Sequence, residues 1–129
     1  MAQVTVTSRR ENLAGRRREF SEAIHACVTS ALGLPPEKRF HRFVALAPED
    51  FVHPPDRTER YTIVELSMFE GRSREAKKAL IRGLYEKFEK DLGIGPADLE
   101  ITIFETPRAN WGIRGKPGDE LELGYKVEA

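Results

Sequence analysis

The sequence predicts an α+β fold in which a β-α-β unit occurs twice and builds one four-stranded mixed sheet with two helices on one face. Residues 2–46 align with residues 62–106 at an offset of sixty, without a gap. Few aligned residues are identical, but apolar positions and helix stops keep the same spacing in both copies, which indicates an internal duplication. We therefore expect a single domain of two copies joined by a crossing loop at about 47–60, and followed by a C-terminal hairpin and arm at 107–129.

The first copy, at about 2–46, begins with residues 3–7, whose alternation of polar and apolar side chains predicts a strand. Residues about 13–32 carry apolar side chains at helical spacing, namely Phe20, Ile24, Cys27, Val28, Ala31 and Leu32. Gly33 and the two prolines that follow predict the end of this helix. Residues about 39–46 then form a second strand, which we expect to run parallel to the first because a helix connects them.

The second copy, at about 61–106, repeats this order. Tyr61 to Phe69 is rich in strand-forming residues, and Ser73 is a suitable N-cap for a helix that reaches about Leu92. Leu99 to Glu105 is the expected fourth strand. Residues 121–127 alternate again and predict a short edge strand or arm.

One face of this sheet is expected to lack a cover within the chain. Both helices of two right-handed β-α-β units lie on the same face. Alternation in strand 61–69 places Val64, Leu66 and Met68 on one side, and Ile63 and Phe69 on the other. The face away from the helices is therefore partly apolar, and burial against other copies of the chain is the simplest way to cover it.

Composition excludes several classes of function. Lysine plus arginine and aspartate plus glutamate are equal at 21 each among 129 residues, which argues against a general nucleic-acid binder. We interpret the basic run 16–18 as a solvated helix face. Cys27 is the only cysteine, so it cannot form an internal disulfide and is expected in the core. Neither a signal-like apolar run nor a membrane-length segment is evident, so we expect a cytoplasmic protein.

Four places in the sequence can carry chemistry. If Met1 is removed, as the small Ala2 permits, the α-amine of Ala2 heads the first strand and, with an ordinary pKa of about 7.7–8.0, can move protons near neutral pH. Arg72 lies in the turn from strand to helix, where a guanidinium and backbone N–H groups favour a carboxylate. Each feature has a plainer alternative, because every chain has an amino terminus and arginines are common on surfaces.

The other two places are a basic strand and an aromatic loop. Lys38, Arg39 and His41 enter the second strand and could bind a small anion, or they could be solvated ends with one partly buried histidine. Trp111, followed by Arg114, could wall a pocket or could anchor the tail on a neighbour. Neither the spacing of metal ligands nor a phosphate-binding glycine loop is evident, so we expect no metal and no cofactor.

Several segments together are similar to the tautomerase superfamily over nearly the whole chain. They are Glu70-Gly71-Arg72-Ser73-Arg74-Glu75-Ala76-Lys77, Ile101-Thr102-Ile103-Phe104-Glu105-Thr106, Asn110-Trp111-Gly112-Ile113-Arg114-Gly115 and Leu32-Gly33-Leu34-Pro35. The first three resemble 4-oxalocrotonate tautomerase. The duplicated length, the last segment and the tryptophan loop are most similar to the malonate semialdehyde decarboxylase branch. The resemblance implies a tautomerase/MIF-like fold and a homotrimer with active sites near the amino termini.

The resemblance also marks departures from the family's catalytic pattern. The family's amino-terminal proline falls on Ala2, an acidic residue of the decarboxylase branch falls near Lys38, and one arginine of a pair falls on Glu70, while Arg72 matches the other. These departures disfavour decarboxylase activity. The resemblance implies either a keto-enol isomerase of small 2-oxo or enol carboxylates with altered chemistry, or a catalytically inactive trimer that binds small anions or regulates. It implies neither a nucleic-acid nor a membrane partner.

Overall fold

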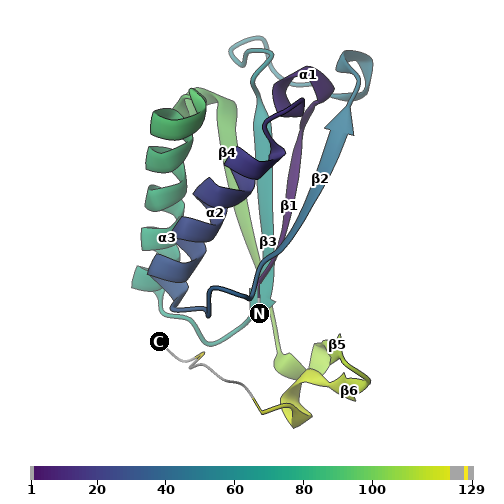
Figure 1. Cartoon of the computed structure of the whole chain (residues 1–129), viewed down its shortest axis with the longest axis vertical. Coiled ribbons are helices and arrows are strands. Elements are labelled where there is room, and N and C mark those ends of the chain that lie inside the picture. Colours follow the sequence, from purple (N-terminus) through teal and green to yellow (C-terminus); the bar gives the residue numbers. More distant parts are fainter. Residues whose placement is uncertain (1, 123–126, 128–129) are drawn as a thin grey trace.

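The computed structural model describes residues 2–122 and 127. Its main feature is a four-stranded sheet that two long helices cover on one side (Figure 1). The strands are β1 (Ala2–Arg9), β2 (Phe40–Leu46), β3 (Thr62–Phe69) and β4 (Leu99–Thr106), and their order across the sheet is β2-β1-β3-β4. The outer pairs β1–β2 and β3–β4 are parallel, while the central pair β1–β3 is antiparallel. The expected mixed four-stranded sheet is therefore confirmed.

The helices follow the expected pattern with one correction. The helix expected from about residue 13 starts at Arg17, as α2 (Arg17–Leu32), and is preceded by the four-residue α1 (Arg10–Leu13). Gly15, with φ of 71°, separates the two, because this left-handed conformation cannot continue a right-handed helix. In the second copy, Ser73 caps α3 (Arg74–Lys87) as predicted, since its side chain accepts the N–H of Ala76.

Short elements complete the chain. A π-helical turn (Phe88–Leu92) extends α3, so this helix ends where the sequence predicts. The C-terminal hairpin consists of β5 (Gly112–Ile113) and β6 (Lys116–Pro117). Short 3₁₀ turns occur at Pro48–Asp50, Pro96–Asp98, Arg108–Asn110 and Gly118–Glu120. Residues 123–126 of the expected edge strand or arm lie outside the described residues, and Leu121 and Glu122 are not in a strand.

Backbone pairing shows the duplication directly. Gln3 pairs with Phe40 in the first copy, and Ile63 pairs with Glu100 in the second, so both parallel registers are the same at the sixty-residue offset. Both helices also stop in the same way, at Gly33 with φ of 66° and at Gly93 with φ of 69°. The two copies are therefore related by a pseudo-twofold axis between β1 and β3.

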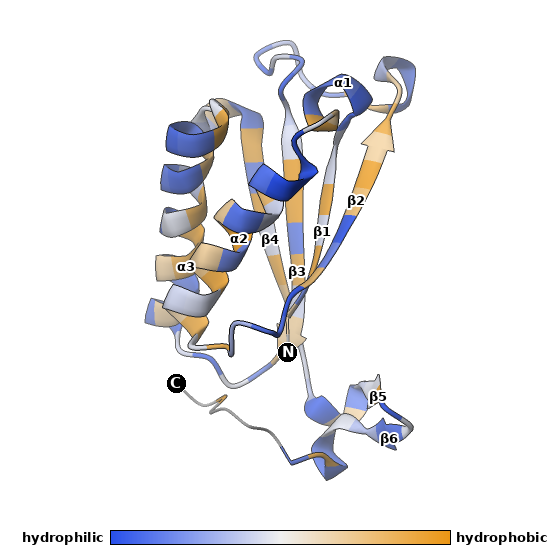
Figure 2. Ribbon diagram, viewed as in Figure 1, coloured by the Kyte–Doolittle hydropathy of each residue, from blue (hydrophilic) through white to orange (hydrophobic). Residues whose placement is uncertain are grey.

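The core lies between the sheet and the helices, where apolar residues of α2, α3 and the strands face one another (Figure 2). Phe20 of α2 and Phe88 at the end of α3 are fully buried and meet edge to face at 5.6 Å between ring centroids. Burial of one such ring stabilises the fold by about 1.5–3 kcal/mol. Cys27 is buried with a free thiol, as expected, and burial raises its pKa to about 11.

The opposite face of the sheet is partly apolar, as the alternation in the second copy predicts. Phe40 pairs with Gln3, Gln3 with Ser67 and Ser67 with Phe104, so the two phenylalanines lie in one row across the sheet. Phe40, Val44 and Phe104 are 39%, 40% and 47% exposed. We call these three side chains the open-face strip.

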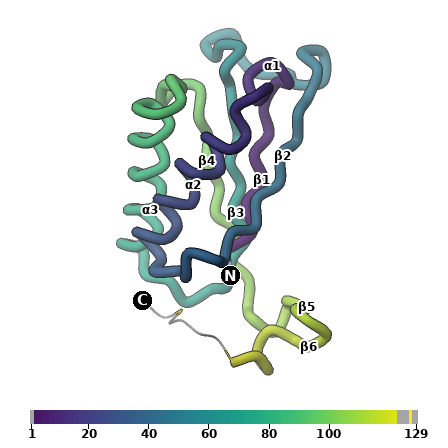
Figure 3. Tube along the Cα trace, viewed as in Figure 1, coloured from purple at the N-terminus to yellow at the C-terminus, as the bar shows by residue number. Residues whose placement is uncertain are grey.

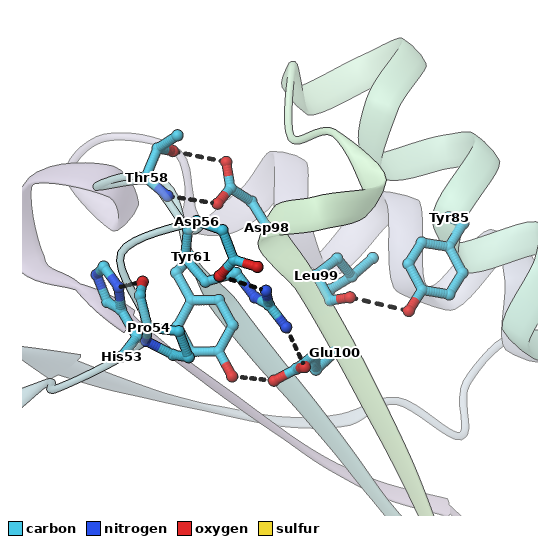
Figure 4. Close-up of polar contacts among 10 residues, drawn as sticks. His53, Pro54, Asp56, Thr58, Tyr61, Tyr85, Asp98, Leu99 and Glu100 are labelled. Atoms are coloured by element: carbon cyan, nitrogen blue, oxygen red, sulfur yellow. Dashed lines mark hydrogen bonds and ion pairs between the residues drawn. The ribbon is translucent and has the colours of Figure 1, made fainter.

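The crossing loop between the copies is tied by polar contacts to β4 and to the 3₁₀ turn that precedes it (Figure 4). The buried carboxylate of Asp98 accepts the Thr58 N–H at 2.7 Å and the Thr58 hydroxyl at 2.6 Å. Glu100 accepts hydrogen bonds from the Tyr61 hydroxyl and, at 2.9 Å, from Arg57. These contacts fix the path of residues 56–61 into β3.

Candidate active site at the amino end of the central strand

Most of the predicted site residues lie at one end of the sheet. There β1 and β2 begin while β3 and β4 end, because the central pair is antiparallel and each outer pair is parallel. Ala2 pairs with Met68, and Met68 with Glu105, so the start of β1 lies beside the ends of β3 and β4 (Figure 3). We call this region the amino-end site.

Ala2 is held firmly at this end. It is the first residue of β1, is 3% exposed and shares the helix-facing side of the strand with Val4 and Val6. Backbone pairing with β3 restricts it on one side, and β2 pairs with the next residue, Gln3, on the other. A free α-amine on Ala2 would therefore be held in place by the sheet and would not lie on a mobile tail.

Arg72 lies in the turn between β3 and α3 and is only 8% exposed. Its Nη1 donates a hydrogen bond to the backbone carbonyl of Leu32, the last residue of α2. A cation is favourable at this end of a helix, where the macrodipole is negative. A guanidinium has five N–H donors in a planar fork, so it can bind a helix carbonyl and a further acceptor together. Arg72 thus joins the amino-end site to the end of α2.

Trp111 anchors the C-terminal hairpin on the ends of β3 and β4. Its indole Nε1–H donates to the hydroxyl of Thr106 at 2.7 Å, and its ring meets Phe69 edge to face at 5.2 Å. The Arg108 guanidinium lies 5.7 Å from the Phe69 ring centroid and donates to the carbonyl of Gly118. This geometry favours the anchoring role, with the hairpin of the same chain as the element that is anchored.

Sequence reasoning did not select Phe69, Thr106 or Arg108 for the site. Phe69 is 1% exposed although it lies on the same side of β3 as Ser67, because the hairpin covers it. In the sequence, these residues are marked only by their position beside the ends of the two strands on which the tryptophan loop could fold.

Arg39 and His41 face α2 rather than the amino-end site. Arg39 forms an ion pair with Glu22 at 2.9 Å, and its hydrogen bond lowers the pKa of that carboxyl. The His41 Nδ1 lies 2.7 Å from the hydroxyl of Ser21, and its ring is 6.2 Å from that of His25. Burial, together with the charge of Arg39, lowers the pKa of His41 to about 4, so the ring is neutral at pH 7.

Lys38 and Arg114 differ in their relation to this end. Lys38 is half-buried and lies two residues before β2, whose pairing with β1 begins at Phe40 and Gln3. Arg114 is exposed in the turn between β5 and β6, where it has a positive φ of 49°. Lys38 therefore lies at the amino-end site, whereas Arg114 lies in the hairpin that projects from it. Among the described residues, no three His, Cys, Asp or Glu side chains gather where they could hold a metal ion.

The chain is similar to known tautomerases in sequence. Residues 38–114 match the family described as tautomerase enzyme. A 2-hydroxymuconate tautomerase of Comamonas testosteroni is 37% identical over 57 residues, which are 44% of this chain and 90% of that protein. A 2-hydroxymuconate tautomerase of Pseudomonas putida is 36% identical over 59 residues, or 46% of this chain and 94% of that protein. These relatives are thus close in length to one of the two copies.

Solved structures of the same fold span both copies. A malonate semialdehyde decarboxylase has a TM-score of 0.80 at 20% identity and covers 92% of this chain and 99% of its own. A native fused 4-OT also has a TM-score of 0.80 at 20% identity, with 92% and 98% covered. None of the helices in the described part of the chain is both long enough and apolar enough to span a membrane. From its sequence match and its fold, this chain belongs to the tautomerase family.

Proposed function

We propose that this protein is a keto-enol isomerase of small 2-oxo or enol carboxylates, in which the α-amine of Ala2 moves the proton. The observation that carries the proposal is the place of Ala2, a fixed first residue of a central strand at the sheet end that also holds Arg72 and Lys38. Relatives that are 2-hydroxymuconate tautomerases support the reaction class.

The proposed step needs only acid–base chemistry. The neutral amine removes the enol O–H proton, which leaves an ammonium group and an enolate, and the ammonium then protonates carbon to give the 2-oxo acid. Atoms and charge balance without a cofactor. The amine is suited to both roles because its ordinary pKa of about 7.7–8.0 lies near neutral pH. Arg72 and Lys38 would hold the substrate carboxylate through charge-assisted hydrogen bonds.

Removal of Met1 is the first condition to test. Intact mass spectrometry of the purified protein shows whether Ala2 carries the free amine. The ketonisation of phenylenolpyruvate and of 2-hydroxymuconate is then followed with the parent protein, with Lys38→Ala and with Arg82→Ala. The last is a matched control, because Arg82 is exposed on α3. We expect turnover in the parent and the control, and a raised KM in Lys38→Ala. A retained Met1, or no rate above buffer, refutes the proposal.

A catalytically inactive relative is the second candidate, and two observations favour it. Ala2 lacks the ring of the family's proline, and Arg72 already donates a hydrogen bond to the carbonyl of Leu32. Ala2→Pro separates the two candidates. Activity that is absent in the parent and appears in Ala2→Pro would assign the parent to the inactive class, while robust turnover by the parent excludes that class.

We infer that the working form is a homotrimer. The open-face strip supports an association through the sheet face, because its three large apolar side chains are 39–47% exposed in the single chain. A solved fused 4-OT with a TM-score of 0.79 is a trimer, which supports the proposed assembly.

A further inference from the structure

A cavity lies at the opposite end of the sheet from the amino-end site. It has a volume of about 350 Å³, and Arg9, Arg16 and Arg60 line it together with Asn12. Arg9 ends β1, Arg16 directly precedes α2, and Arg60 ends the crossing loop. We propose that this cavity, the arginine pocket, binds a small oxyanion, either a carboxylate or a phosphate.

Two of the three guanidiniums are held at the pocket by uncharged partners. Arg16 Nη2 donates to the carbonyl of Leu92, and Arg60 Nη1 donates to the carbonyl of Gly93 at 2.6 Å. Both carbonyls lie at the C-terminal end of the helical segment formed by α3 and the π-helical turn. The helix macrodipole is negative there, so cations are favourable. Because a backbone carbonyl carries no formal charge, these two contacts fix the positions of both arginines without neutralising them. Arg16 also forms a long ion pair with Glu19, whose exposed carboxylate lies 3.9 Å from the Arg16 Nε.

Arg9 adds an independent indication. Its Nε is buried and has no hydrogen-bond partner among the described residues. A buried donor without an acceptor is unfavourable, and such groups in native proteins usually bind something. An oxyanion in the pocket that Arg9 lines would supply the missing acceptor after a small movement of the Arg9 side chain, because the Nε is closed to solvent in the empty pocket.

The balance of charge at the pocket is positive. Glu11 and Glu59 also line it, but both are exposed, and no ion pair within the described part of the chain joins either of them to Arg9, Arg16 or Arg60. The lining therefore carries three permanently charged guanidiniums and two solvated carboxylates, and the exposed Glu19 that pairs with Arg16 is not part of the lining. Guanidinium forks match the planar oxygens of carboxylates and the oxygens of phosphates.

The duplication explains why this pocket would bind without catalysing. The sixty-residue offset relates Ala2 to Thr62 and Arg72 to Asn12, so the arginine pocket is the counterpart of the amino-end site. Thr62 lies within the chain and has no amine to offer. Asn12 Nδ2 donates to Ser8 Oγ at 2.8 Å and to Thr62 Oγ1 at 3.2 Å, which fills this end with a closed polar cluster. The pocket is thus independent of the proposed reaction.

The test is binding observed at the arginines themselves. Sodium phosphate and sodium pyruvate are titrated separately, at constant ionic strength, into the whole protein labelled with nitrogen-15. The Nε–Hε signals of Arg9, Arg16 and Arg60 are followed by NMR and assigned from single variants. We expect saturable shifts with a dissociation constant of about 1 mM or tighter for one or both anions. The two titrations show which oxyanion the pocket prefers.

Variants tie the binding to the pocket. Arg9→Gln and Arg60→Gln are expected to weaken binding by about tenfold or more, because each removes a charge-assisted hydrogen bond. Arg82→Gln, an exposed arginine on α3, is the control and should bind as the parent does. Glu59→Gln changes an exposed side chain, leaves the packing intact and should tighten binding several-fold, so the proposal stays testable if an arginine variant fails to fold.

The proposal is overturned if neither anion moves the three arginine signals. It is also overturned if Glu59→Gln and Arg9→Gln bind like the parent. Because the readout is binding, loss or absence of isomerase activity does not affect the result.

Discussion

The Arg72 guanidinium donates a hydrogen bond to the backbone carbonyl of Leu32, and this bond ties the turn after β3 to the carboxyl end of α2. The residues are forty positions apart in the chain and belong to different copies. Arg72 is therefore part of the scaffold of the amino-end site as well as a candidate for binding substrate there. Stability and activity must be measured separately on any Arg72 variant.

Arg72→Met is expected to lower the free energy of unfolding by about 1–3 kcal/mol, because it leaves a helix carbonyl without its charged donor. Urea denaturation followed by far-ultraviolet circular dichroism measures this loss. Arg72→Lys keeps the charge without the planar fork and should lose less. Arg82→Met, on the exposed side of α3, should stay within about 0.5 kcal/mol of the parent. If Arg72→Met and the parent have the same free energy of unfolding, the hydrogen bond to Leu32 does not contribute to stability.

The fold could be predicted from the sequence because its signals are local and occur twice. Gly33 and Gly93 stop the helices at the expected residues, and the alternation in β3 identifies its two faces correctly. The start of α2 was misplaced because residues 9–19 are mostly charged and carry little apolar periodicity. The left-handed backbone conformation of Gly15 sets that boundary, and the presence of a glycine in a sequence does not reveal its φ angle.

The candidate site was harder to predict, since its contacts join residues far apart in the chain. The sequence places Ala2, Lys38, Arg72 and Trp111 near strand ends, and the structure brings these ends together. It cannot show that Arg72 meets Leu32 or that Trp111 meets Phe69, because such contacts depend on how turns direct long side chains. For the same reason, Arg39 and His41 were grouped with the site although both face α2.

The open-face strip predicts the effect of a charge on assembly. Phe104→Asp should shift the proposed trimer to monomers, because an unpaired charge buried in an interface costs about 3–5 kcal/mol. Sedimentation velocity at several concentrations measures the change. Val52→Asp is the control, since Val52 is 91% exposed in the crossing loop. A parent protein that is monomeric at all concentrations, or an intact trimer of Phe104→Asp, would contradict the proposed interface.

The lowered pKa of His41 predicts how the free energy of unfolding depends on pH. Burial lowers its pKa from 6.5 to about 4 in the folded chain, so between these values the unfolded chain binds more protons. The stability that the neutral ring contributes is complete above pH 6.5 and is lost as the pH falls toward 4. Because solvent reaches part of the ring, we expect the loss to be about 1–2 kcal/mol.

Denaturation of the parent and of His41→Gln at a series of pH values measures this contribution. The groups near the ring are Arg39 and His25, which both oppose its protonation, and Ser21, which is neutral. The difference in the free energy of unfolding between the parent and His41→Gln should therefore narrow as the pH falls from 6.5 to 4. Parallel curves over this range would show that another group carries the pH dependence.

The two helix stops predict an asymmetry between the copies. Gly33→Ala should cost about 1 kcal/mol, because its left-handed φ is strained for alanine while the space around its Cβ is empty. Gly93→Ala carries the same strain, and its Cβ would lie 3.1 Å from Arg60 Nη1, so the guanidinium must shift. We expect Gly93→Ala to be less stable than Gly33→Ala and to alter the arginine pocket as well. Thermal unfolding compares the stabilities, and the Arg60 Nε–Hε signal reports the shift. An Arg60 signal that is the same in both variants would show that Gly93 and Arg60 are not coupled.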